Sequence, residues 1–174
     1  MPGNEAHLQE LLDREDIRQC LFRYSRAIDR VDEALLRTVY WPGAVDNHGS
    51  FNGDAEGFIA WVIPLLQTMD QTMHLLGNML IEVDGDRSAS ETYFVAFHRR
   101  TGDDGRPVEA HVVGRYLDQM ERRGGEWRIL HRDCVYDFNF EGQAADWTKR
   151  AFDLDYRTNR KPDDISYRIL PTRG

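Results

Sequence analysis

The sequence predicts an α+β domain shaped as a cone, in which three N-terminal helices close a pocket on a strongly curved antiparallel sheet. Apolar residues recur with helical spacing up to about residue 69, and after Asp70 the period changes to two. Four long alternating runs follow, separated by the short connectors DGDR, TGDDGRP and RRGGE, which are typical of β-hairpins. Helices gathered before the strands favour a layer of helices on one face of the sheet.

Length and composition agree with one folded domain. The chain has 174 residues, 41% of them hydrophobic and 11% aromatic, which is enough for a sizeable core. Its net charge of −8 argues against nucleic acid or an anionic membrane as the partner. Cys20 and Cys134 favour a reducing compartment and leave a disulfide open. The sequence shows no signal-peptide core and no run of membrane-spanning length, so we expect a soluble cytoplasmic protein.

The helical part divides into three segments. The first helix is predicted from about Glu5, with a break or bend near Asp13. Asp32 is expected to cap a short second helix. The third is predicted over residues 55–69, where Pro64 should kink it or end it early.

The predicted strands form one meander. A small hairpin over residues 44–51 precedes the third helix, and the long strands are expected at residues 72–83, 88–100, 108–121 and 127–140. Residues 1–140 are therefore expected to be a single domain. Residues 141–174 would carry a last helix, at about 144–152, and an arm that packs on the body or on a neighbouring subunit.

One histidine and one aspartate are candidates for chemistry. Strand alternation places His74 and Asn78 on the more polar face of their strand, which would point into the pocket. No second histidine or cysteine lies near enough to His74 in the sequence to share a metal. If His74 has a function, a base that transfers protons is therefore the better interpretation. The alternative is a histidine that only packs in the core. Asp29 lies at a predicted helix C-terminus, where a negative charge is disfavoured. This unfavourable position suggests that Asp29 has a specific role.

These residues also carry a resemblance to a known family. The long helix ends in Tyr24-Ser-Arg-Ala-Ile-Asp29, a short helix ends in Tyr40-Trp41, and a strand opens with Thr72-Met73-His74. This layout, over about residues 8–140, resembles the nuclear transport factor 2-like cone fold. Within that fold it resembles the SnoaL-like branch, which includes scytalone dehydratase, bile-acid 7α-dehydratase and γ-hexachlorocyclohexane dehydrochlorinase.

The resemblance implies a function and a set of site residues. In lyases of this branch such a histidine and aspartate form a dyad, so His74 would be the general base and Asp29 the carboxylate that orients it. Tyr24 would hold a substrate oxygen, and His98 matches a second active-site histidine more loosely. The implied activity is that of a lyase without cofactor or metal, a dehydratase or a related elimination on a small apolar cyclic or polyketide-like substrate.

Two other functions stay open. An isomerase or polyketide cyclase could use the same base, and a non-catalytic ligand-binding domain, like the small subunits of ring-hydroxylating dioxygenases, could use the same fold. The resemblance also implies a homo-oligomer, either a dimer or a trimer.

Further candidates come from residue type and position. Tyr93 could polarise a leaving oxygen, and Arg115 and Arg132 lie within strands, where an arginine is unusual unless it is paired or lines a cavity. Large aromatic residues of the helical half are expected in the core or in the pocket wall, namely Trp41, Phe58 and Trp61. His48 is expected in a hairpin turn or at the pocket mouth.

Overall fold

A computed structural model describes residues 2–143, 160–164 and 166–169. The helices are α1 (Pro2–Arg30), α2 (Glu33–Arg37), α3 (Ala55–Gln67) and α4 (Ser166–Ile169). The strands are β1 (Tyr40–Asn47), β2 (Asn52–Asp54), β3 (Gln71–Asp84), β4 (Arg87–Thr101), β5 (Pro107–Arg123) and β6 (Glu126–Gln143). The predicted α+β class and the order of elements are confirmed, while the predicted helix at 144–152 lies outside the described residues.

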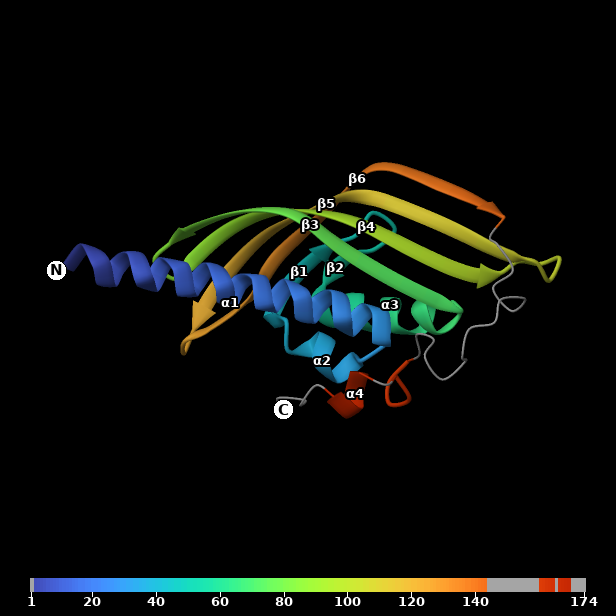
Figure 1. Ribbon diagram of the computed structural model, residues 1–174, viewed down its shortest axis with the longest axis horizontal. Coiled ribbons are helices and arrows are strands. Elements are labelled where there is room, and N and C mark those ends of the chain that lie inside the picture. The colour runs from blue at the N-terminus through green and yellow to red at the C-terminus, as the bar shows by residue number, and fades with distance from the viewer. Residues whose placement is uncertain (1, 144–159, 165, 170–174) are drawn as a thin grey trace.

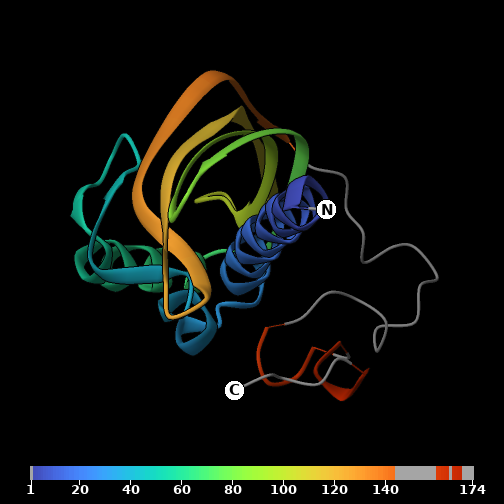
Figure 2. The same ribbon diagram turned by 90° about the vertical axis from the view of Figure 1, so that its left-hand side faces the viewer.

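The six strands form one open sheet. Its order is β2-β1-β6-β5-β4-β3, and the hairpins β3–β4, β4–β5 and β5–β6 are antiparallel as predicted. β1 joins the edge of this meander parallel to β6, a pairing that the sequence did not indicate. The sheet curls over α1 and α3, and α2 lies below the end of α1 (Figures 1 and 2). Its concave side therefore faces the helices.

The first helix is continuous, so the predicted break near Asp13 is wrong. The Asp13 carboxylate is buried and accepts hydrogen bonds from Trp127 Nε1 at 3.0 Å and from Arg122 at 2.6 Å. These hydrogen bonds satisfy the buried carboxylate while Asp13 remains in the helix. Helix α1 therefore continues past Asp13 without a break. Asp32 caps α2 as predicted, and α3 continues one turn past Pro64.

A bulge in β3 changes which side chains face inward. The pairing with β4 is regular from Gln71 to Leu76, shifts, and resumes at Met79, so that β3 carries one extra residue. The two residues within the shift, Gly77 and Asn78, are exposed. One extra residue in a strand reverses the alternation after it. The prediction that Asn78 points into the pocket with His74 is therefore wrong.

Arg132 is a residue of β6 whose side chain is buried in the core. Its guanidinium donates to both oxygens of Asp118, at 2.6 and 2.8 Å, and neither side chain is exposed. It also lies between the rings of Tyr24 and Tyr116, 4.0 and 4.1 Å from their centroids. Removing one partner of such a pair would leave an unpaired buried charge. Arg132 therefore stabilises the packing of the sheet. Of the two alternatives stated for Arg132, the ion pair is confirmed, and a place in the pocket lining is wrong.

The described C-terminal segment docks at the end of α1. Arg160 donates to the Asp29 carbonyl and to Thr72 Oγ1, at 2.5 and 2.8 Å, and its second nitrogen donates to the Met69 carbonyl at 3.3 Å. One guanidinium thus ties together the ends of α1 and α3 and the start of β3. These three elements also border the cavity described below. Among the described helices, none has the length and apolarity needed to cross a membrane.

Candidate functional site

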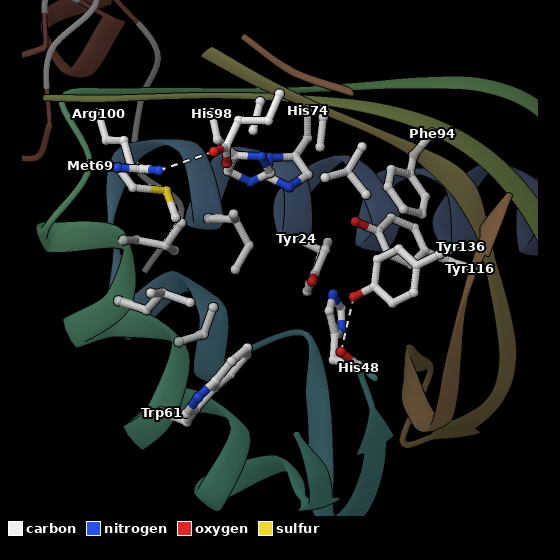
Figure 3. A pocket seen from close by; sticks show the side chains of 18 residues that line it. Tyr24, His48, Trp61, Met69, His74, Phe94, His98, Arg100, Tyr116 and Tyr136 are labelled. Carbon is white, nitrogen blue, oxygen red and sulfur yellow. Dashed lines mark hydrogen bonds and ion pairs between the residues drawn. The ribbon is translucent and has the colours of Figure 1, made fainter. Parts of the chain in front are cut away.

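A cavity of about 300 Å³ lies between the concave side of the sheet and helices α1 and α3. This volume is at the small end of the range for ligand pockets. One wall is apolar and comes from α3 and the end of α1, with Ile28, Trp61, Val62, Leu65, Leu66 and Met69. The polar lining includes Tyr24, His48, His74, His98 and Tyr136, which surround the cavity (Figure 3). A small, largely apolar molecule with a few polar atoms fits this lining.

The Asp29 carboxylate holds His74 by two contacts. Asp29 Oδ1 lies 2.8 Å from His74 Nδ1, and Asp29 Oδ2 accepts the backbone N–H of His74 at 2.8 Å. Both side chains are close to fully buried, at 7% and 11% exposure for His74 and Asp29. Contact with a carboxylate favours the tautomer that carries its proton on Nδ1. His74 Nε2 then has a free lone pair, and within the described chain it has no hydrogen-bond partner.

The sheet edge explains why Asp29 reaches His74. β3 is the last strand of the sheet, so one of its edges has no neighbouring strand among the described residues. A buried N–H on such an edge needs an acceptor from elsewhere. α1 ends at Arg30 beside this edge, and Asp29 in its last turn supplies the acceptor. The contact with His74 outweighs the mild penalty of a carboxylate at a helix C-terminus.

His98 lies beside His74 on the next strand. The two rings meet edge to face, 5.4 Å between centroids and 86° between planes. Burial, and secondarily the neighbouring His74, lower the pKa of His98 to about 4. His98 is therefore neutral at pH 7 and can offer a hydrogen bond to a substrate without adding charge to the cavity.

We expect His98→Gln to reduce the acid sensitivity of folding. The pKa of His98 is about 4 in the folded protein and near 6.5 when it is exposed, so the unfolded chain binds a proton first as the pH falls. The free energy of unfolding should drop through this window, and the variant should lose less of it, by on the order of 3 kcal/mol. Urea unfolding of both proteins at about pH 7 and pH 4 measures this. Equal losses in the two proteins would show that burial does not hold His98 neutral.

The tyrosines of the cavity keep their protons. Burial raises the pKa of Tyr24, whose ring is packed on Arg132, and burial also raises the pKa of Tyr136. Tyr24 Oη therefore acts at neutral pH as a hydrogen-bond donor, as the predicted role in holding a substrate oxygen requires. Tyr24, Trp61, His74 and His98 all line the cavity, as predicted, and Asp29 lies directly behind His74.

Two other predicted residues lie on the outer face of the sheet. Tyr93 is 46% exposed, because in β4 it alternates with the inward-facing Phe94. Arg115 pairs with Asp137 at 3.2 Å and with Glu91 at 3.7 Å on the same outer face. Both residues are thus outside the cavity, and their assignment to the pocket is wrong, while the ion pair stated as the alternative for Arg115 is confirmed.

Two predicted aromatic residues also lie outside the cavity lining. Trp41 donates from Nε1 to the Glu121 carbonyl at 2.7 Å, and its ring is covered by Arg123 and Arg128. Phe58 is buried in the core and stacks on His48, 4.9 Å between ring centroids. Phe58 supports a residue of the cavity without itself being part of the lining.

Several lining residues were not predicted. Phe94 and Ala96 face inward with His98, and strand alternation could have found them. Tyr136 follows a register shift in the β5–β6 pairing, so alternation could not have placed it. At one end of the cavity Arg100 pairs with Glu141 at 3.2 Å, an interaction between strands that are not adjacent in sequence (Figure 3). Within residues 2–143, 160–164 and 166–169, no cluster of three or more His, Cys, Asp or Glu is arranged to hold a metal ion.

Comparison with known sequences gives one family. The sequence profile of the SnoaL-like domain matches residues 9–133. An uncharacterized protein from Mycobacterium tuberculosis, Rv2910c, is 29% identical over 126 residues, which cover 71% of this chain and 84% of that protein. Because this relative is itself uncharacterized, its similarity to the chain indicates no activity.

Solved structures share the fold. A type 2 hexachlorocyclohexane dehydrochlorinase, LinA, superposes with a TM-score of 0.70 at 17% identity, over 80% of this chain and 95% of that chain. A candidate scytalone dehydratase from Novosphingobium aromaticivorans gives a TM-score of 0.69 at 18% identity, over 78% of this chain and 91% of that chain. At these identities the likeness shows the cone fold alone.

Proposed function

The chain belongs to the family of SnoaL-like domains, and from this premise we propose that it is a lyase that acts without a cofactor. Its reaction would remove a carbon-bound proton and a leaving group from adjacent atoms of a small, largely apolar cyclic substrate. Two proteins that share its fold are named for reactions of this class, a dehydrochlorination and a dehydration. Their names support the reaction class, and the residues of the cavity support the assignment of the base.

One observation carries the proposal. His74 is held at Nδ1 by the Asp29 carboxylate, 2.8 Å away, with Nε2 available to a cavity that is mostly apolar. A neutral imidazole in this tautomer can take a proton at Nε2, and the carboxylate stabilises the imidazolium that forms. A substrate carbonyl or ring would make the hydrogen acidic enough for such a base.

The reaction then needs only the residues in the cavity. His74 Nε2 takes the proton, the C–H electron pair becomes the new double bond, and the leaving group departs with its own bonding pair. The neutral His98, in ring contact with His74, and the protonated Tyr24 can donate hydrogen bonds to a substrate oxygen on which charge develops. The apolar wall formed by α3 would hold the ring and exclude water.

A product analysis in deuterated water tests the reaction class. The probe is a hydroxytetralone whose hydroxyl is β to the ketone, which yields a naphthol on losing water. We expect wild-type protein to form the naphthol faster than buffer alone. Incorporation of deuterium next to the ketone without loss of water would instead support the isomerase or cyclase alternative, since such enzymes also begin with proton removal. Absence of both would contradict the proposed function.

A further inference from the structure

A second histidine–aspartate pair lies in the same cavity. His48 directly follows β1, which lies near the other end of the strand order from β3. Its Nδ1 lies 2.8 Å from Asp46 Oδ1. Figure 3 shows the His48 imidazole pointing into the cavity from the side away from His74, with Tyr24 and Tyr136 beside it. The side chains of His48 and Asp46 are 14% and 0% exposed. This pair therefore repeats, across the cavity, the arrangement of His74 and Asp29.

The Asp46 carboxylate is held from two sides. Its second oxygen accepts a hydrogen bond from Tyr40 Oη at 2.6 Å. Burial and the charge of Asp46 raise the pKa of Tyr40 well above its usual range, so this phenol remains a donor. The carboxylate oxygen facing His48 is then left to accept from Nδ1–H. His48 Nε2 has no hydrogen-bond partner among the described residues and is available to a ligand.

Packing fixes the His48 ring in this position. The ring stacks on Phe58 at 4.9 Å, with 29° between planes, and lies 6.0 Å from the ring of Tyr116. The hydroxyl of Tyr136 donates to the His48 carbonyl at 2.9 Å. A residue of a surface turn needs none of these contacts, whereas a group that must meet a substrate atom is expected to be held in this way.

We propose that His48, oriented by Asp46 and Tyr40, is a second acid–base residue that protonates the leaving oxygen while His74 removes the carbon-bound proton. The inference rests on the proposed lyase function and adds a substrate class to it. The leaving group would be a hydroxyl, which departs poorly unless it is protonated, and not a halide or another anion that leaves unaided.

The two histidines together balance the reaction. His74 takes the proton and its C–H electron pair becomes the double bond. The C–O bond breaks with its pair on oxygen, and the Nε2 proton of the His48 imidazolium moves to that oxygen, which leaves as water. His74 ends protonated and His48 neutral, and transfer of one proton through solvent restores both. The substrate must present its C–H to β3 and its hydroxyl to the end of β1.

Two probes separate the acid from the base. Nitrobenzisoxazole opens when a base removes its C–H proton, and the nitrophenolate that leaves needs no proton. The hydroxytetralone needs both groups. We expect His48→Gln to lower kcat/KM for hydroxytetralone dehydration by about 10²-fold and to change ring opening by less than about 3-fold. A merely structural role for His48 would instead slow the two reactions by similar factors.

The chain offers a matched control on β6, the strand that pairs with β1. His131 pairs with Asp133 at 3.2 Å, next to β1 but on the outer face of the sheet. His131→Gln removes an imidazole from a histidine–aspartate pair outside the cavity and should leave both reactions unchanged. Thermal unfolding of both variants checks that each is folded.

Each outcome decides the matter. A His48→Gln variant that slows both probes equally, or neither, would overturn the inference. A wild-type protein that opens nitrobenzisoxazole and leaves the hydroxytetralone intact would overturn it too, because the cavity would then supply a base without an acid. Wild-type rates no higher than those of a His74→Ala variant on both probes would count against the proposed function itself.

Discussion

Replacing His74 by Ala should lower kcat/KM for both probe reactions by about 10³-fold or more, while the fold stays intact. His74 is the imidazole whose Nδ1 is held by Asp29 at 2.8 Å and whose Nε2 has no hydrogen-bond partner among the described residues. Without it the remaining lining residues offer hydrogen bonds but no oriented base beside β3. Steady-state absorbance assays with nitrobenzisoxazole and with the hydroxytetralone measure the loss.

A second histidine of the sheet provides the control for this variant. His111 is in β5, where Nε2 contacts Glu109 at 2.9 Å, and it is not part of the cavity lining. His111→Gln should retain wild-type rates. If His74→Ala retains activity as well, His74 is a packed core histidine and the base must be sought elsewhere.

Much of the fold was predictable because its signals are local. The change of period after Asp70 and the glycine-rich connectors gave the four long strands nearly to their ends. The break near Asp13 was wrong because the partner that satisfies this carboxylate, Trp127, lies 114 positions away. Sequence periodicity shows that Asp13 is a polar residue among the apolar residues of a helix. It does not show that Trp127, a residue of β6, donates a hydrogen bond to it.

The site was predictable only where alternation is uninterrupted. β4 alternates regularly, so Phe94 and His98 face the cavity, and the same rule would have placed Tyr93 outside it. In β3 the bulge at residues 77–78 reverses the pattern and exposes Asn78. Bulges depend on how two strands pair, and a single strand sequence does not reveal them.

The histidine of the turn shows a different limit. His48 is only two residues from its partner Asp46, yet nothing in the local sequence indicates that Asp46 is completely buried. Its burial follows from the parallel pairing of β1 with β6, in which Asp46 lies opposite the buried Arg132. The resemblance to a family pointed to Asp29 and His74. The second pair became visible only when β1 was placed in the sheet.

Replacing Asp29 by Asn should lower kcat by about 10² to 10⁴-fold with little change in KM. The asparagine keeps the shape of the side chain and can still accept the backbone N–H of His74, a bond that Asp29 makes at 2.8 Å. Its amide group would then face Nδ1 and donate to it. This selects the tautomer with the proton on Nε2, so His74 would present an N–H to the substrate where a lone pair is needed. Because Asp29 lies behind His74, the substrate contacts that set KM remain.

Nitrogen-15 NMR of the His74 ring reports the tautomer directly, and the assays described above give kcat and KM separately. Asp16→Asn is the matched control, since Asp16 is an exposed carboxylate on the same helix, and it should change neither quantity. A purely structural Asp29 would instead show loss of stability with the wild-type tautomer retained in the folded fraction. Loss of kcat together with the switched tautomer would show that this carboxylate acts through His74, since the asparagine of the Asp29→Asn variant preserves the backbone contact while it reverses the tautomer preference and removes the charge that stabilises the imidazolium.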